Sequence, residues 1–180
     1  ILKNKVTGDI AECGVWKGHS AYILSKMLKE VNSNKKFYIF DSFEGGLSDK
    51  SKKDKNKRYN LTSKQIRAEK ISFSSDENQV RKTLSIFNNL YFFKGWIPER
   101  FSEVENSIFC FVHVDVDLYQ PTLDSLNFFY PRLVKGGALV IDDYAISQFP
   151  GARKAVDEFL GSNKFSFFYK VPFGSCFIVK

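Results

Sequence analysis

The feature that most constrains this chain is a regular alternation of short apolar runs with longer amphipathic segments. Strands are predicted at 8–15, 36–40, 90–93, 108–116 and 138–141, with a closing antiparallel pair at 165–171 and 176–180. Helices are predicted at 20–31, 77–87, around 98–105, at 122–133 and at 152–160, the fourth with Pro121 in its first turn and ended by Gly136-Gly137. Strands that are apolar throughout predict a parallel sheet covered by helices on both faces.

The predicted fold class is therefore α/β, a doubly wound, mostly parallel seven-stranded sheet with a C-terminal antiparallel strand pair. The 180 residues fit a single domain, 1–180, and show no internal repeat. The 19 Phe and 8 Tyr indicate a core filled largely by aromatic side chains. In open α/β sheets ligands bind beyond the carboxyl ends of the strands, so chemistry is expected in the residues that follow each strand.

The net charge of +7 is confined to one segment. Between residues 50 and 70, nine Lys and Arg stand against Asp54 and Glu69, which accounts for the whole excess. Such a charge run with few apolar residues predicts a polar loop or a mobile excursion. Tyr59 is its single aromatic residue, so the segment offers no row of rings on which bases could stack, and a nucleic-acid partner is not favoured.

The cysteine pattern favours a reducing compartment. Cys13, Cys110 and Cys176 are odd in number, lie in apolar runs and lack the spacing of a zinc site, which predicts reduced thiols in a cytoplasmic protein. No apolar run approaches the ~18 residues of a membrane span, so no membrane association is expected. Residue 1 is Ile and a strand-like run begins within the first ten residues, so targeting signals upstream stay open.

The first candidate site is the turn at 12–20, between the first predicted strand and the first helix. Its pattern is acid-x-Gly-x-x-x-Gly-x-Ser, in which Gly14 and Gly18 allow close backbone approach beside a helix N-terminus. The third glycine of a dinucleotide-binding GxGxxG motif is missing. The pattern suits a cofactor with an amino-acid end, whose ammonium group needs a carboxylate such as Glu12, although an ordinary glycine turn would look the same.

The second candidate site is Asp41, which directly follows the second predicted strand. An acid at this place holds the ribose hydroxyls in α/β cofactor domains. Taken alone, Asp41 could equally be a solvated turn residue that caps the next segment. Two acids at two strand ends, Glu12 and Asp41, together favour a nucleoside cofactor.

The most specific pattern is an apolar strand that runs into two carboxylates, and it occurs twice. His113-Val-Asp115-Val-Asp117 ends the fourth predicted strand, and Asp142-Asp143 follow the fifth. Clustered carboxylates are costly without a cation, and Asp115, Asp142 and Asp143 could meet one ion at neighbouring strand ends. Mg²⁺, which accepts a few carboxylates and keeps waters, fits better than zinc. We interpret His113, on the same face as Asp115, as a structural residue or one that orients the metal ligands.

Five segments together resemble the macrocin O-methyltransferase family, whose members methylate hydroxyls of sugars and related natural products. They are 12–20, 41–45, Gly95-Trp96, 113–119 and 141–144, and the resemblance covers residues 8 to about 160. The resemblance implies a Rossmann-like class I methyltransferase fold that uses S-adenosylmethionine and Mg²⁺. The N-terminal helices that form a lid over the acceptor in this family have no expected counterpart in 1–180.

The resemblance also implies roles for single residues. Those at the cofactor would be Glu12, Gly14 and Ser20 at the methionine end, Asp41 at the ribose, Ser42, Gly95 and Trp96 near the adenosine, and Asp115. Asp115, Asp142 and Asp143 would bind Mg²⁺. Asp117 would act with Asp115 in catalysis, as the base that removes the acceptor proton, since a metal lowers the pKa of a hydroxyl beside it. The alternative role for Asp117 is to orient the metal ligands.

Two other functions are weighed against this one. An RNA or protein methyltransferase could use 50–70 as a docking arm, and a nucleotide-binding module could do without catalysis. The clustered aspartates disfavour the nucleotide-binding module, because a protein that only binds a nucleotide gains nothing from carboxylates that repel one another. The sequence therefore favours an O-methyltransferase with a small-molecule hydroxyl acceptor, a sugar or a natural product, and is compatible with a homo-oligomer.

Overall fold

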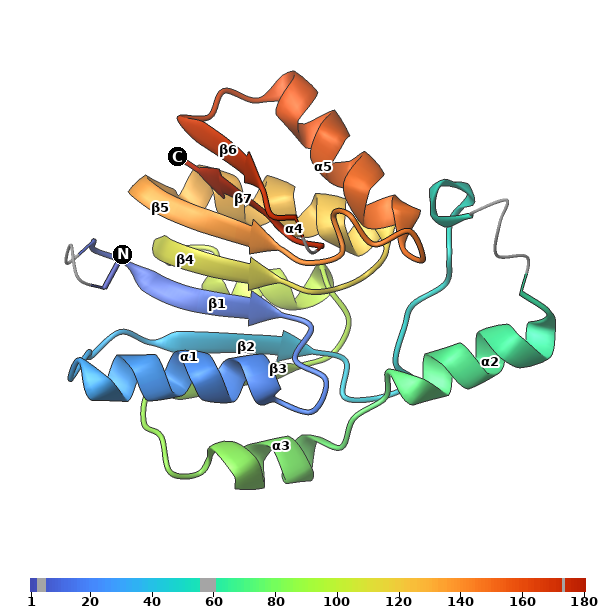
Figure 1. Ribbon diagram of the computed structural model, residues 1–180. Coiled ribbons are helices and arrows are strands. Elements are labelled where there is room, and N and C mark those ends of the chain that lie inside the picture. The colour runs from blue at the N-terminus through green and yellow to red at the C-terminus, as the bar shows by residue number, and fades with distance from the viewer. Residues whose placement is uncertain (3–5, 56–60, 173) are drawn as a thin grey trace.

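The computed structural model describes residues 1–2, 6–55, 61–172 and 174–180. A seven-stranded sheet with the order β3-β2-β1-β4-β5-β7-β6 forms its centre (Figure 1). The strands are β1 (Asp9–Cys13), β2 (Phe37–Asp41), β3 (Leu90–Lys94), β4 (Phe109–Val114), β5 (Leu133–Ile141), β6 (Phe167–Lys170) and β7 (Cys176–Val179). Strands β1 to β5 pair in parallel, whereas β7 runs antiparallel to both β5 and β6. The predicted fold class is confirmed.

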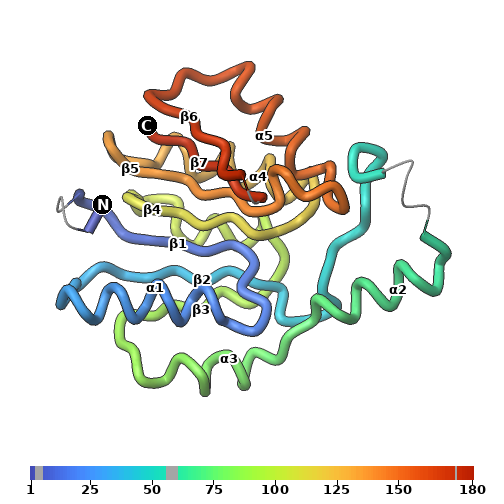
Figure 2. The backbone as a smooth tube through the Cα atoms, viewed as in Figure 1, coloured from blue at the N-terminus to red at the C-terminus, as the bar shows by residue number. Residues whose placement is uncertain are grey.

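Helices cover both faces of the sheet. They are α1 (His19–Glu30), α2 (Ser63–Ser72), α3 (Glu77–Leu84), α4 (Tyr119–Arg132) and α5 (Pro150–Ser162), with two 3-10 helices, η1 (Lys52–Asp54) and η2 (Glu99–Val104). Helices α1 and α3 lie on one face and α4 and α5 on the other, whereas α2 stands beyond the ends of the parallel strands (Figure 1). Figure 2 shows both chain ends at the opposite side, where those strands begin. None of the described helices is long and apolar enough to cross a bilayer.

The larger core, between the sheet and α4, is built of aromatic rings. Phe40 of β2 stacks on Phe93 of β3 with centroids 4.8 Å apart, and Phe101 of η2 meets Phe129 of α4 at 5.0 Å. Three of these rings are almost completely buried, namely Phe40, Phe101 and Phe129. Because burying one such side chain contributes about 1.5–3 kcal/mol, these rings fix the helix layer on the sheet. The prediction of an aromatic core is confirmed.

The basic segment 50–70 is not wholly a loop, and that prediction is corrected. It contains η1 and most of α2, whose first turn is closed by a capping box. The Thr62 side chain accepts a hydrogen bond from the Gln65 amide, and the Gln65 side chain accepts one from the Thr62 amide. Reciprocal capping stabilises a helix locally, and α2 needs it because it buries no residue. Residues 56–60 of the predicted excursion lie outside the described residues.

The junction of α4 and β5 also differs from the prediction. Helix α4 ends at Arg132 and β5 begins at Leu133, so Gly136-Gly137 lies inside the strand and does not end the helix. The register with β4 shifts between its first pair, Phe109 with Leu133, and the pairs that follow. Gly136, with φ 78°, adopts the left-handed conformation at this irregularity, where glycine has no steric cost.

Candidate active site

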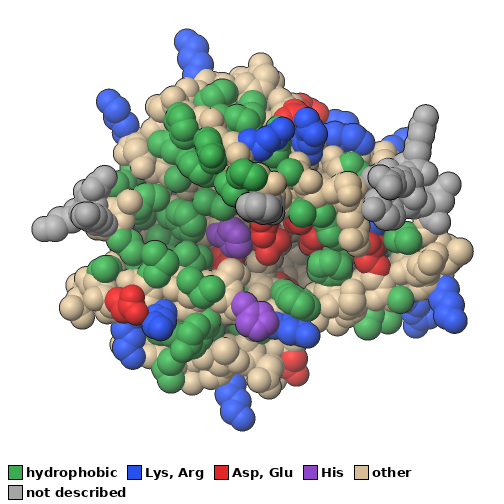
Figure 3. All heavy atoms as spheres, viewed as in Figure 1, with side chains coloured by type: hydrophobic (Ala, Val, Ile, Leu, Met, Phe, Trp, Pro, Cys, Tyr) green, Lys and Arg blue, Asp and Glu red, His purple; other side chains and the backbone are tan. Residues whose placement is uncertain are grey.

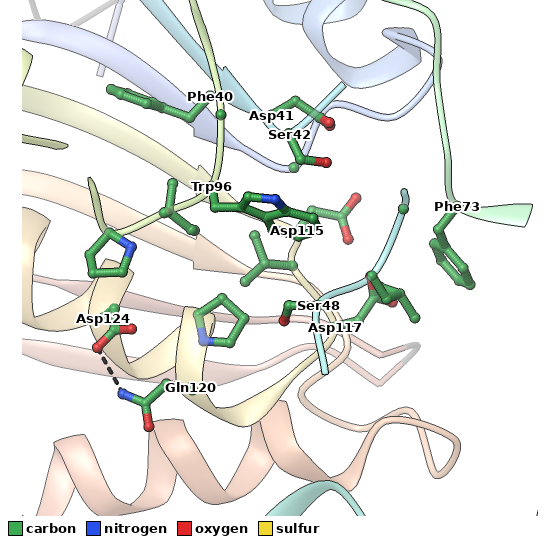
Figure 4. A pocket seen from close by; sticks show the side chains of 18 of the residues that line it. Phe40, Asp41, Ser42, Ser48, Phe73, Trp96, Asp115, Asp117, Gln120 and Asp124 are labelled. Carbon is green, nitrogen blue, oxygen red and sulfur yellow. Dashed lines mark hydrogen bonds between the residues drawn. The ribbon is translucent and has the colours of Figure 1, made fainter. Parts of the chain in front are cut away.

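The parallel strands end at one edge of the sheet, and a cavity of about 350 Å³ lies there (Figure 4). Its walls come from the loops that follow β1, β2, β3 and β4, together with the first turns of α4. Of the predicted site residues, seven line it: Gly14, Asp41, Ser42, Gly95, Trp96, Asp115 and Asp117. Residues up to 103 positions apart in the sequence thus meet in one hollow, as expected for an open α/β sheet.

The glycine turn after β1 is pressed against the end of β4. Gly14 has φ 80°, and a Cβ atom built on it would lie 1.7 Å from the Asp115 carbonyl oxygen. The Asp115 amide donates a hydrogen bond to the Cys13 carbonyl at 2.8 Å, which holds the two loops together. A side chain at position 14 would therefore displace Asp115, so the glycine is required by the close approach as well as by its dihedral angles.

Asp41 joins the end of β2 to this turn. Its Oδ2 accepts hydrogen bonds from the amides of Val15 at 2.8 Å and Trp16 at 2.9 Å, and its Oδ1 accepts one from the Phe43 amide at 2.8 Å. One carboxylate thus fixes both loops that flank the cavity. That Asp41 contacts a ribose stays a prediction. The three amides hold its carboxylate in place beside the cavity.

Trp96 lies in the middle of the cavity, with Asp41 and Ser42 to one side and Asp117 to the other (Figure 4). Its side chain is 39% exposed, and the ring of Phe40 completes an apolar wall. Gly95 precedes it with φ 136° and leaves no room for a Cβ, which would lie 2.8 Å from Cδ of Arg100. An exposed indole beside polar strand ends is suited to packing against a flat ligand ring.

Two predicted cofactor residues lie outside the cavity wall. Ser20 is the second residue of α1 and is partly exposed. Glu12 has no exposed surface, and its Oε1 lies 2.8 Å from Nδ1 of His113. The structure thus separates Glu12 and Ser20 from the other six predicted cofactor residues, and their roles toward the methionine end stay predictions.

The acidic side chains at the ends of β4 and β5 form two overlapping groups. Donor atoms of His113, Asp115 and Asp142 lie within 4.8 Å of one another, and so do those of Asp115, Asp117 and Asp143. Asp115 belongs to both groups and therefore links Asp142 to Asp143. The Ser175 hydroxyl donates a hydrogen bond to Asp142, which orients that carboxylate. Figure 3 shows acidic side chains beside a hollow at the middle of this face.

The carboxyl groups of this cluster are buried and close together, which makes their charged forms costly. Burial, followed by repulsion from neighbouring carboxylates, raises the pKa of Asp117 to about 9 and that of Asp143 to about 7. Burial also raises the pKa of Asp115 to about 6, with Asp142 and Glu12 adding to the effect. Asp143 Oδ2 is buried without a hydrogen-bond partner among the described residues. Crowded, desolvated oxygens with an unused lone pair fit a hard divalent ion.

Several lining residues escaped the sequence reasoning. Ser48 and Asp49 come from the loop after β2, Phe73 ends α2, and Gln120 and Asp124 lie on the first turns of α4. The side-chain amide of Gln120 donates a hydrogen bond to Asp124 Oδ1 at 2.9 Å, and Figure 4 draws this contact as a dashed line. Gln120 and Asp124 are four residues apart on the helix that follows the acids of β4, and this spacing could have predicted that they line the cavity. The sequence around Phe73 has no comparable pattern.

A second cavity, of about 720 Å³, adjoins the first and shares Asp49 with it. It is open to solvent and is lined by the basic segment and by Gln148, with Ile66 and Leu61 as apolar wall. Two of its lysines are paired, Lys50 with Glu69 and Lys70 with Asp49. The basic segment therefore builds a cavity wall in which part of its charge is neutralised.

Known proteins share this sequence pattern and this fold. The 8-demethyl-8-(2,3-dimethoxy-alpha-L-rhamnosyl)-tetracenomycin-C 4'-O-methyltransferase of Streptomyces olivaceus is 29% identical over an alignment 172 residues long, which covers 89% of this chain and 61% of that protein. The mycinamicin III 3''-O-methyltransferase of Micromonospora griseorubida is 28% identical over 162 residues, 88% of this chain and 62% of that protein. The chain thus spans about three fifths of the length of these curated relatives.

A solved structure of the O-methyltransferase NovP superposes with a TM-score of 0.78 at 22% identity, covering 99% of this chain and 74% of that one. This likeness shows the fold. The family described as Macrocin-O-methyltransferase (TylF) matches residues 1–167, nearly the whole sequence. The chain therefore belongs to the macrocin O-methyltransferase family.

Proposed function

We propose that this protein transfers the methyl group of S-adenosylmethionine to a hydroxyl of a sugar or other natural-product acceptor. The observation that carries the proposal is the cavity at the strand ends, which Asp41 and Trp96 line together with Asp115 and Asp117. Its two halves offer what the reaction needs, a place for a nucleoside and carboxylates for the acceptor. One relative named above methylates a rhamnosyl-tetracenomycin and another methylates mycinamicin III, which supports the same acceptor class.

The cofactor would lie over the glycine turn. Its ribose would meet Asp41 and its adenine would pack near Trp96 and Ser42, all of which line the cavity. The methionine end would reach toward Glu12 and Ser20. A positively charged sulfonium beside the buried carboxylates of Asp115 and Asp117 is favoured by opposite charge in a site of low dielectric.

A divalent ion, which we assign as Mg²⁺, would be held by Asp115, Asp142 and Asp143. When bound, such an ion supplies Lewis acidity, which lowers the pKa of an acceptor hydroxyl beside it. Asp117 would accept the hydroxyl proton on a carboxylate oxygen once a neighbouring cation lowers the pKa of its carboxyl group, which burial and the nearby carboxylates raise. The acceptor oxygen forms the new bond to the methyl carbon, and the bond pair of the broken C–S bond stays on sulfur.

The acceptor would extend from Asp117 past Asp49 into the second cavity. That cavity has polar side chains such as Gln65 and Gln148 beside the apolar Ile66, a mixture that suits a sugar attached to a less polar body. The basic segment would thus serve acceptor binding. Lys50 and Lys70 are occupied by Glu69 and Asp49, which disfavours their use as a docking arm for RNA.

The compartment and assembly follow less directly. The three cysteines are free and buried, as expected for a protein kept in a reducing environment, which supports a cytoplasmic placement. Small-molecule acceptors are the partners that the two cavities accommodate. A homo-oligomer stays a prediction, which sedimentation can test.

Methyl transfer to a panel of glycosides, followed by mass detection of S-adenosylhomocysteine, tests the proposal. Chelator is expected to abolish turnover while cofactor binding persists. Asp117→Asn should lower the turnover rate by about 100-fold or more with Mg²⁺ affinity kept, whereas Asp142→Asn should weaken Mg²⁺ binding and regain activity at high Mg²⁺. Glu30→Gln, an exposed change on α1, is the control. Full activity in chelator would leave a metal-independent methyltransferase.

A further inference from the structure

We infer that His113 supplies a nitrogen ligand to the divalent ion at Asp115 and Asp142, and that buried Glu12 orients its imidazole for this task. The inference rests on the metal proposed above and adds to it a residue outside the carboxylate set. It changes the predicted chemistry of the site from all-oxygen to mixed nitrogen and oxygen. It also revises the interpretation of His113 as a structural or orienting residue.

The first argument is distance. Bonds of about 2.0–2.2 Å from an ion to nitrogen or oxygen allow two of its ligand atoms to lie up to about 4.4 Å apart. One ring nitrogen of His113 and one carboxylate oxygen each of Asp115 and Asp142 lie within 4.8 Å of one another, a few tenths of an ångström beyond this limit. His113 and Asp115 are two residues apart at the end of β4, which places them on the same face.

The second argument is the orientation of the ring. Glu12 of β1 is the register partner of His113 on β4, and its Oε1 lies 2.8 Å from Nδ1. When Nδ1–H of the neutral ring donates to this carboxylate, Nε2 is the nitrogen left with a free lone pair. A metal-ligating histidine almost always donates its other ring N–H in this way, commonly to a carboxylate. The pair is thus preorganised as a ligand and its support.

The third argument concerns cost. Glu12 has no exposed surface and the His113 side chain is 14% exposed, so a pair with a structural role alone would bear a desolvation penalty that apolar residues avoid. Glu12 Oε2 is moreover buried without a hydrogen-bond partner among the described residues. A cation at Nε2 would draw electron density through the ring and strengthen the hydrogen bond to Glu12, which offsets part of this penalty.

A nitrogen ligand at this site would change which metal ion it prefers. Imidazole nitrogen suits first-row transition ions, whereas sites built from carboxylates and water suit Mg²⁺. A set of one imidazole with two or three carboxylates should therefore bind Mn²⁺ or Co²⁺ more tightly than Mg²⁺. Replacing His113 by Asn should reduce this preference, because Mn²⁺ affinity falls more than Mg²⁺ affinity.

The chain has just two histidines, which allows a direct test. His19 is exposed at the start of α1, so His19→Gln removes the other imidazole without touching the site. This variant, produced with ¹⁵N-labelled histidine and loaded with Mn²⁺, is examined by electron spin-echo envelope modulation. In the labelled protein we expect a coupling between Mn²⁺ and the ¹⁵N nucleus of a bound imidazole. In unlabelled protein a ¹⁴N coupling should take its place. The bound ion itself gives this signal, so no activity is needed.

Titration of Mn²⁺ into variants completes the experiment. His113→Asn should lose the imidazole coupling, and Glu12→Gln should weaken Mn²⁺ binding by about 10- to 100-fold. Suppose that Asp142→Asn weakens Mn²⁺ binding but the bound Mn²⁺ shows no histidine coupling. This result would overturn the role of His113 as a ligand and would leave the proposed metal site intact. Absence of any Mn²⁺ binding that depends on Asp142 would overturn the metal site as well. The labelled His19→Gln protein decides the question even if the buried variants do not fold.

Discussion

The carboxylate of Asp54 accepts a hydrogen bond from the backbone amide of Tyr119 at 2.6 Å, across 65 residues of sequence. Tyr119 is the first residue of α4, and Asp117, the proposed base, lies two residues before it. The other oxygen of Asp54 accepts bonds from the amide and the hydroxyl of Ser51 at 2.7 and 2.6 Å. A residue of the basic segment thus caps the helix that carries part of the cavity wall.

Asp54→Ala is therefore expected to destabilise the protein by about 1–3 kcal/mol, because it removes a buried acceptor and leaves amides of the α4 and η1 ends unpaired. Thermal unfolding followed by circular dichroism measures the effect. Asp49→Ala, directly before that segment and with a side chain that is 98% exposed, is the matched control and should change stability by less than about 0.5 kcal/mol. Equal effects of the two substitutions would contradict the capping role.

The first turn of α5 touches the same carboxylate, which gives a second prediction. A Cβ atom on Gly151 would lie 1.8 Å from Asp54 Oδ1 and 2.7 Å from the Tyr119 amide, whereas Gly161 of the same helix has nothing within 4 Å. Gly151→Ala should destabilise by about 1–3 kcal/mol through overpacking. Gly161→Ala should stabilise by a fraction of 1 kcal/mol, since alanine favours a helix. Chemical denaturation measures the free energy of unfolding of both variants. An unchanged value for Gly151→Ala would show that Asp54 and the Tyr119 amide move aside at no cost.

A third prediction concerns pH in metal-free protein. Burial raises the pKa of Asp115, Asp143 and Asp117 from 3.8 to about 6, 7 and 9. The folded state therefore binds more protons than the unfolded chain between pH 4 and 9. The stability due to these protons is complete below about pH 4 and is lost as pH rises through about 6, 7 and 9.

With chelator present, the melting temperature should thus fall by several degrees between pH 5 and pH 9, and Mg²⁺ should restore most of the loss at the alkaline end. Differential scanning calorimetry over this range, with and without Mg²⁺, measures both effects. Asp117→Asn should flatten the alkaline part of the profile, because it removes the group with the highest pKa. A chelated protein that gains stability up to pH 9 would contradict the burial of these carboxylates.

A fourth prediction tests the cofactor half of the cavity. Asp41→Ala removes the acceptor for the amides of Val15 and Trp16, and with it the proposed ribose partner. Its affinity for S-adenosylhomocysteine should fall by about tenfold or more, corresponding to roughly 1.4 kcal/mol. Isothermal titration calorimetry gives this affinity, with Glu30→Gln as control. Equal affinity for NAD, together with an unchanged affinity in the variant, would contradict a site for S-adenosylmethionine at this turn.

The sequence by itself determined the elements that depend on local pattern. Apolar runs with acids at their ends, such as the one that leads to Asp115, predicted both the parallel strands and the edge where the cavity lies. This works because a parallel strand is buried on both faces and its carboxyl end is exposed. The antiparallel partner strands at the C-terminus were recognised for a similar reason, since each is a short apolar run.

The tertiary structure alone decided contacts between segments far apart in the chain. Helix α2 buries nothing, so hydrophobic periodicity could not reveal it, and β5 begins at Leu133 because that residue pairs with Phe109. The partner of Glu12 is set by strand register, which places His113 opposite it across 101 residues. Local sequence carries no record of register or of long-range capping, and these features arise only when the sheet assembles.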